Sequence, residues 1–139
     1  MIVLDTNVLS EFTRPTPSAK VLNWLAAIPR TDLYTSAITQ AELQLGVELL
    51  PEGKKRTAIG REIERLLSET ISGRVLAFDG KAAREYSLLA AFRRRLGRPI
   101  DELDAQIAAI ARAHGFALAT RNVRDFEHCG VELLNPWGE

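Results

Sequence analysis

The chain has 139 residues, of which 46% are hydrophobic and 26% charged, a composition typical of one ordinary globular domain. Lys+Arg and Asp+Glu both number 18, so the net charge alone does not indicate nucleic-acid binding. Cys129 is the only cysteine, which excludes an intrachain disulfide and favours a reducing compartment. The N-terminus lacks the basic region of a signal peptide, and no apolar run approaches a membrane span. We therefore expect a cytoplasmic protein without membrane contact.

Short apolar strands alternate with amphipathic helices in the first half of the chain. Residues 2–4 are apolar without alternation, as in a strand buried on both faces of a parallel sheet. Ser18 can cap the helix that follows. A second strand is expected at residues 33–38, running into a helix that reaches Leu50, and a third helix at residues 54–70.

The second half of the chain repeats this alternation. In chain order, we expect a strand, two helices and two more short strands at residues 74–78, 79–97, 102–114, 116–119 and 131–134. Strands alternating with helices predict an α/β fold: one α/β/α sandwich with a central, mainly parallel sheet of four to five strands.

Carboxylates and other oxygen ligands occur where ligands bind in such folds, outside the carboxyl ends of the strands. Asp5 directly follows the first strand, Glu42 follows the second by about one helical turn, and Asp104 lies in the first turn of its helix. Thr120 and Asn122 follow the fourth strand. If these segments converge, they form an acidic pocket without His or Cys, which suits Mg²⁺ or Mn²⁺ rather than zinc. Phosphodiester hydrolysis is the chemistry that best matches such a pocket.

Each acid also has a purely structural interpretation. Residues 39–42 match a capping box, residues 101–104 match a helix cap followed by an acid that favours the helix dipole, and residues 5–7 match an Asx turn. Asp125 fits a loop cap or a solvent-exposed position equally well. Taken singly, these positions favour the structural interpretation. Taken together they favour a site, because packing does not require acids at corresponding ends of several buried elements.

Two basic clusters offset the acids. The first consists of Arg93, Arg94, Arg95 and Arg98, and the second of residues 54–56. Basic side chains at the rim of an acidic pocket would attract phosphates despite the zero net charge. Both basic clusters can equally well be solvent-exposed helix faces and loops without a role in phosphate binding.

Several segments, in order and spacing, match one family. They are residues 4–7, residues 36–43 with Gly46, residues 97–100 leading to 104–108, residues 119–122 with 125–126, and residues 135–137. On these segments the chain resembles the PIN-domain family, in particular the VapC/FitB branch of ribonuclease toxins from toxin–antitoxin pairs. The resemblance covers essentially the whole chain and implies a single PIN domain over residues 1–139.

The resemblance implies a role for each acid. Asp5, Glu42 and Asp104 match the family's metal-site acids and are expected to bind Mg²⁺ or Mn²⁺. At the fourth position some members carry an aspartate where this chain has Asn122, whereas others use an acid like Asp125. We therefore expect a core of three acids, with Asn122 and Asp125 as supporting candidates.

The resemblance also implies partners and further site residues. The hydroxyls of Thr6 and Thr120 are expected to position water or metal. A homodimer is implied, together with an antitoxin whose C-terminal segment blocks the active site and whose DNA-binding part reaches operator DNA. Residues 93–95 and Arg98 are the expected contacts for RNA phosphate or an acidic antitoxin segment. The alternative is a catalytically weak PIN-like binding module that acts with a DNA-binding antitoxin, because Asn122 brings no charge.

Overall fold

The computed structural model describes residues 1–138 and contains one five-stranded parallel sheet. The strands lie in the order β3-β2-β1-β4-β5, and every neighbouring pair runs in parallel. Their bounds are β1 (Ile2–Leu4), β2 (Leu33–Ser36), β3 (Val75–Leu76), β4 (Ala117–Ala119) and β5 (Leu133–Leu134). Because β1 is the central strand, the residue that follows it emerges at the middle of the sheet's carboxyl edge.

Helices connect these strands and cover the sheet. Among residues 1–138, none of them has the length and apolar character needed to cross a membrane. In chain order they are α1 (Thr6–Ser10), η1 (Glu11–Thr13), α2 (Ala19–Ala26), η2 (Arg30–Asp32), α3 (Ala37–Glu48), α4 (Lys54–Arg65), η3 (Leu66–Thr70), α5 (Gly80–Arg95), α6 (Glu102–His114) and η4 (Val123–Phe126).

Several helices begin at side chains that satisfy free backbone N–H groups. Ser18 caps α2, Ser36 caps α3, Asp79 caps α5 and Asp101 caps α6, each by accepting N–H groups of the first turn. Gly115 ends α6 with a φ of 68°, the left-handed conformation that glycine adopts without a steric penalty. The predicted cap at Ser18 and the predicted helix start at residue 102 are confirmed, whereas α5 begins at Gly80, one residue after the predicted start, because Asp79 is its cap.

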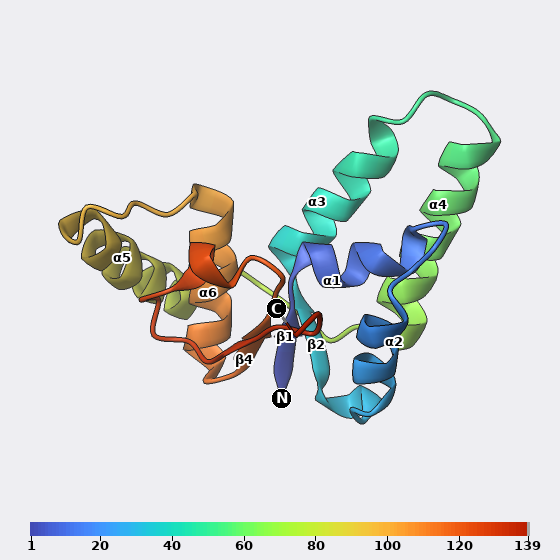
Figure 1. Cartoon of the computed structure of the whole chain (residues 1–139). Coiled ribbons are helices and arrows are strands. Elements are labelled where there is room, and N and C mark those ends of the chain that lie inside the picture. Colours follow the sequence, from blue (N-terminus) through green and yellow to red (C-terminus); the bar gives the residue numbers. More distant parts are fainter. Residues whose placement is uncertain (139) are drawn as a thin grey trace.

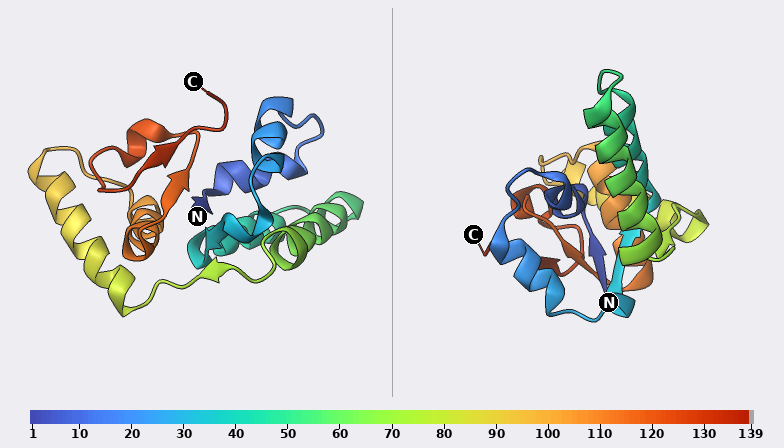
Figure 2. Two further views of the ribbon diagram at one scale, coloured as in Figure 1. Left: turned by 90° about the horizontal axis from the view of Figure 1, so that it is seen from below. Right: turned by 90° about the vertical axis from the view of Figure 1, so that its right-hand side faces the viewer.

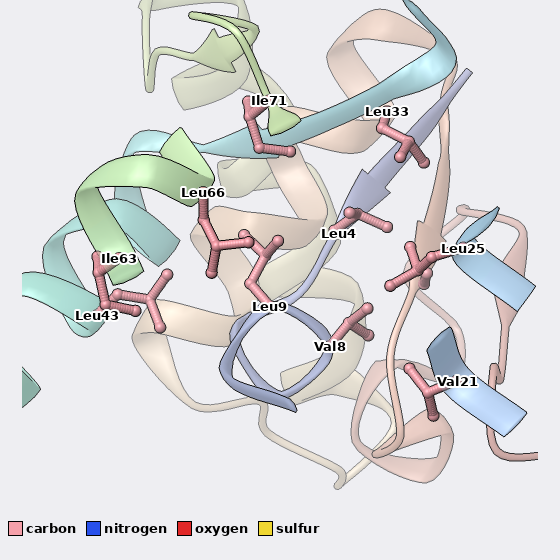
Figure 3. Close-up of a cluster of buried hydrophobic side chains, with 11 residues drawn as sticks. Leu4, Val8, Leu9, Val21, Leu25, Leu33, Leu43, Ile63, Leu66 and Ile71 are labelled. Atoms are coloured by element: carbon pink, nitrogen blue, oxygen red, sulfur yellow. The ribbon is translucent and has the colours of Figure 1, made fainter. Parts of the chain in front are cut away.

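The two faces of the sheet bury separate hydrophobic cores. Leu4 of β1 points into a core formed with α1, α2, α3 and α4, whereas Val3 points into a core formed with α5 and α6. Figure 1 shows the strands between these two groups of helices, and Figure 3 shows Leu4 beside Leu9 in the first core. In Figure 2, α3 and α4 extend side by side beyond the sheet. The predicted α/β/α sandwich is confirmed.

Some element bounds differ from the sequence-based prediction. The strand expected at residues 33–38 ends at Ser36, because the Ser36 hydroxyl accepts the N–H of Thr39 (3.0 Å) and starts α3 there. The helix expected at residues 54–70 is α4, followed from Leu66 by a wider π-helical turn. The short helix α1 was not predicted.

The outer strands are shorter than expected. The strand predicted at residues 74–78 pairs only at Val75–Leu76, and the one at 131–134 only at Leu133–Leu134. Both lie at an edge of the sheet, where one side of the strand has no neighbouring strand to pair with.

Candidate active site

Asp5 lies at the carboxyl end of the central strand and is only 5% exposed. Its N–H donates to the Ala119 carbonyl of β4 (2.9 Å). One carboxylate oxygen, Oδ1, accepts the N–H of Thr6 (2.8 Å), and the other, Oδ2, accepts the hydroxyl of Thr120 (2.7 Å). Asp5 therefore starts α1 and is fixed to the loop after β4 through the same carboxylate.

Glu42 reaches this region from α3. The Thr6 hydroxyl donates to Glu42 Oε1 (2.7 Å) and lies 3.1 Å from the Thr39 hydroxyl. The N–H of Thr39 donates to Ser36, which is the cap of α3. The capping-box interpretation of residues 39–42 is therefore wrong, because the Glu42 carboxylate faces α1 rather than the start of its own helix.

Asp104 lies in the first turn of α6 and is partly buried. Asp101 Oδ2 accepts the N–H of Leu103 (3.2 Å) and of Asp104 (3.4 Å), so Asp101 is the helix cap. The structural interpretation of residues 101–104 is thus correct for Asp101. It does not account for the carboxylate of Asp104.

Asn122 directly precedes the short turn η4, and Asp125 lies within it. The N–H of Asn122 donates to the Thr120 hydroxyl (3.1 Å), which itself donates to Asp5. The N–H of Asp125 donates to the Asn122 carbonyl (3.0 Å). The side chains of Asn122 and Asp125 are exposed at the surface. Through the Thr120 hydroxyl, the residue that precedes the turn is tied to Asp5 at the end of β1.

The carboxylates influence one another electrostatically. Burial, followed by the charges of Asp5, Asp101, Asp125 and Glu42, raises the pKa of Asp104 from 3.8 to about 6. Like charges act on a pKa in this way only when they lie near one another. Asp5 and Asp104 are therefore each within electrostatic range of Glu42 and Asp125. We call Asp5, Glu42, Asp104 and Asp125 the acid cluster.

The pKa of Asp5 is set by opposing effects. Burial raises the pKa above its ordinary value, and the charges of Glu42 and Asp125 raise it further. The hydrogen bonds from Thr120 and Thr6 act against this, because they favour the ionised carboxylate. The pKa remains raised, so the ionised form of Asp5 is disfavoured by its position in the fold.

The acid cluster does not by itself form a complete coordination sphere. Among residues 1–138, no three His, Cys, Asp or Glu side chains already surround one point suited to an ion. Asp5 and Glu42 each direct an oxygen to a threonine hydroxyl instead. Among residues 1–138 the predicted acids thus lie within electrostatic range of one another but do not form a preassembled ion site.

The arginines predicted to contact RNA or an antitoxin differ from one another. Arg93 is only 4% exposed and its guanidinium donates to backbone carbonyls, so the structure contradicts the prediction for this residue. Arg98 pairs with Glu127 through both terminal nitrogens (3.2 Å each). Arg94 and Arg95 are exposed and face solvent.

Some site residues were missed by reasoning from the sequence. Thr39 is fully buried and brings its hydroxyl to Thr6, and Asn7 Oδ1 accepts the N–H of Arg121 (3.3 Å). Thr35 is also fully buried and donates to the Leu4 carbonyl (2.8 Å). Polar residues in and just after a strand of an otherwise buried sheet were the available signal for Thr35 and Thr39.

Known proteins match the chain along its length. A family model described as PIN domain matches residues 2–131. The VapC ribonuclease Y4jK of Sinorhizobium fredii is 45% identical over 137 residues, covering 99% of this chain and 98% of the relative. Toxin FitB of Neisseria gonorrhoeae is 41% identical over 137 residues, covering 99% of each chain. The structure of FitAB bound to an IR36 DNA fragment matches with a TM-score of 0.92 at 40% identity, covering 99% of this chain and 96% of that one. The chain therefore belongs to the PIN-domain family.

Proposed function

We propose that this chain is an endoribonuclease toxin that hydrolyses RNA phosphodiester bonds with Mg²⁺ or Mn²⁺ and is neutralised by a cognate antitoxin. The observation that carries the proposal is the placement of Asp5 at the carboxyl end of the central strand, tied through Thr6 to Glu42 and within electrostatic range of Asp104 and Asp125. Relatives named as a VapC ribonuclease and as toxin FitB, each matched over nearly the whole chain, support the reaction and the biological role.

The donor set fits a hard divalent cation. The acid cluster offers only carboxylate oxygens, which Mg²⁺ and Mn²⁺ prefer. Burial raises the pKa of Asp104 and of Asp5, and neighbouring carboxylates raise both further, so a cation among them would offset this penalty. Asp5, Glu42 and Asp104 would hold the ion, with Asp125 or Asn122 in support. When bound, such an ion lowers the pKa of a coordinated water and offsets charge on the phosphate.

The chain's own residues orient the carboxylates. The Thr120 hydroxyl holds Asp5 Oδ2 and leaves Oδ1 to the N–H of Thr6. The Thr6 hydroxyl holds Glu42 Oε1, so Oε2 is the Glu42 oxygen that would contact a cation. These hydroxyls are neutral and therefore fix the carboxylates without cancelling the negative potential that attracts a cation.

Arg94 and Arg95 are the best candidates for contacts to RNA phosphate. Both are exposed in the last turn of α5. Arg98 forms an ion pair with Glu127 and would have to leave this pair to contact a phosphate. We expect Arg94→Ala with Arg95→Ala to weaken RNA binding and to reduce the salt dependence of the affinity, because fewer counterions are released.

We also propose that the chain acts with protein partners. FitAB, a structural neighbour, is bound to DNA, and this chain's sequence shows no DNA-reading motif, so operator DNA would be reached through the antitoxin. A homodimer would cover part of α5, where Leu88, Phe92 and Leu96 recur every four residues and are 41%, 50% and 47% exposed. Light scattering after chromatography tests this, because Phe92→Glu should shift a dimer toward monomer.

The decisive experiment uses the purified chain, free of any partner, on total RNA with Mg²⁺, with Mn²⁺ and with EDTA. Asp5→Asn and Asp104→Asn are compared with Glu48→Gln, which removes an acid from the same helix as Glu42. Glu48 pairs with Arg56 (2.6 Å) and is a matched control outside the acid cluster. We expect metal-dependent cleavage by the wild type and by Glu48→Gln, and loss of cleavage in both aspartate variants.

Two results would contradict the proposal. Cleavage that persists in EDTA would exclude the metal-dependent mechanism. A folded wild type that is inert on every RNA and with both ions would favour the alternative, a PIN-like binding module that regulates its operator with the antitoxin.

A further inference from the structure

Arg93 is a buried cation whose charge is directed at backbone carbonyls. It lies in the last turn of α5 and is 4% exposed. Its Nε donates to the carbonyl of Arg98 (2.7 Å), and its Nη1 donates to the carbonyls of Asp125 (2.9 Å) and Glu127 (2.9 Å). The same Nη1 lies 3.5 Å from Cys129 Sγ. A buried guanidinium is stabilised here by several acceptors rather than by a carboxylate partner.

These carbonyls belong to two different segments of the active-site region. Arg98 lies in the loop of residues 96–101, which leads from α5 into the helix that carries Asp104. Asp125 and Glu127 lie in and just after η4. A single side chain therefore joins the segment that precedes Asp104 to the turn that carries Asp125.

The other end of η4 is tied to Asp5. The N–H of Asn122 donates to Thr120, and the Thr120 hydroxyl donates to Asp5 Oδ2 (3.1 and 2.7 Å). The turn is thus anchored at its start to the central strand and at its end to Arg93. With both ends fixed, the position of the Asp125 side chain relative to Asp5 depends on the two anchors together.

We propose that Arg93 is a positioning residue for the acid cluster, setting the separation between the Asp104-bearing helix and the Asp125-bearing turn. The inference rests on the proposed function, because it assigns Arg93 a role in holding the ion-binding acids. Lysine cannot replace it: the guanidinium presents N–H donors in a rigid planar fork, whereas an ammonium offers its donors from one nitrogen. Arg93→Lys keeps the charge and much of the volume while losing this geometry.

Arg112 provides a matched control. It lies on α6, pairs with Glu85 of α5 (2.7 Å) and donates to the carbonyl of Cys129 (3.4 Å). It therefore also joins α5, α6 and the segment after η4. Its position is about 12 Å further along the helix axis than Asp104. Arg112→Lys tests the loss of a comparable arginine contact away from the acid cluster.

The experiment measures kcat, KM and Mn²⁺ affinity for the full chain at a temperature well below every melting transition. The variants are Arg93→Lys, Arg112→Lys, Asp125→Asn and the double variant of Arg93→Lys with Asp125→Asn. We expect Arg93→Lys to lower kcat and Mn²⁺ affinity roughly 10-fold to 100-fold with little change in KM, as outer contacts of metal ligands do. Arg112→Lys, which lies away from the acid cluster, should leave kcat and Mn²⁺ affinity close to those of the wild type. The double variant should fall no further than the lower single variant, because both changes act on one element.

Two outcomes would overturn the inference. One is an equal effect of Arg93→Lys and Arg112→Lys, and the other is effects of Arg93→Lys and Asp125→Asn that multiply in the double variant. If the wild type binds Mn²⁺ but cleaves no RNA, the proposed function fails while the affinities still decide the role of Arg93.

A measurement on the wild type alone covers the case in which Arg93→Lys does not fold. Hydrogen exchange is followed with and without Mn²⁺ at the amides of residues 96–101 and 122–127. Because Arg93 joins these segments, we expect Mn²⁺ to slow exchange in both. Protection of residues 122–127 alone, or of neither segment, would contradict the inference.

Discussion

The metal-free protein is expected to become more stable as the pH falls from neutral toward about 4. The pKa of Asp104 is about 6 in the folded chain, against 3.8 for an ordinary aspartate. Between these values the folded chain binds a proton that the unfolded chain has released. The free energy of unfolding therefore decreases as the pH rises through this window. An aspartate with a depressed pKa behaves in the opposite way, losing its stabilising contribution on acidification.

The size of the effect follows from the pKa of Asp104. A rise from 3.8 to about 6 corresponds to a penalty of about 3 kcal/mol on the ionised folded state, as an upper limit. Asp104 is only partly buried, so solvent screening reduces this to about 1–2 kcal/mol. For a chain of this length, that amounts to about 3–8 °C in Tm. Asp5, whose pKa is also raised, contributes in the same direction.

Thermal unfolding followed by circular dichroism in EDTA, between about pH 4.5 and about pH 7.5, measures this effect. Asp104→Asn cannot ionise at this position and should lack its share of the slope. At neutral pH, Mg²⁺ should stabilise the wild type more than Asp104→Asn. Parallel curves for the wild type and Asp104→Asn would refute the reasoning, because Asp104 would then carry no penalty that an ion could relieve.

Three substitutions test the rest of the structure. Thr120→Val keeps the shape of a buried side chain but removes the hydroxyl between Asp5 and Asn122, and should lower the unfolding free energy in urea by about 1.5–3 kcal/mol. Leu9→Ala leaves a cavity in the first core and should cost about 2–5 kcal/mol in the same assay. Gly115→Ala forces a side chain to adopt a φ of 68° and should cost about 1–2 kcal/mol, measured as a lower Tm. An unchanged denaturation midpoint in any of them would contradict the contact or conformation assigned to it.

Elements with a long periodic pattern and a local cap were predictable from the sequence. The helix at residues 102–114 is confirmed with the same bounds, because Asp101, the apolar repeat and Gly115 all act within the segment. Residues 6–10 form α1, which is too short to show a helical period. The end of β2 depended on whether Ser36 extended the strand or capped the next helix, and in the structure its hydroxyl caps α3.

The convergence of the acids was predictable because parallel topology brings the carboxyl ends of strands to one edge. The role of Arg93 was not. In the sequence it belongs to a run of arginines, and nothing distinguishes it from Arg94 and Arg95. Neighbouring positions on a helix point in different directions, so only the packing of α5 against the segment after η4 separates a buried arginine from exposed ones.

The choice of hydrogen-bond partners explains how the fold tolerates a cluster of carboxylates. Glu11, Glu48, Glu85 and Glu127 each pair with an arginine, and all four lie outside the acid cluster. Asp5 and Glu42 are held by threonine hydroxyls instead. An arginine partner would also orient a carboxylate but would cancel the negative potential that attracts a cation. Neutral donors orient the acids and leave the effects of burial and like charge in place, so the proposed divalent ion would relieve this penalty on binding.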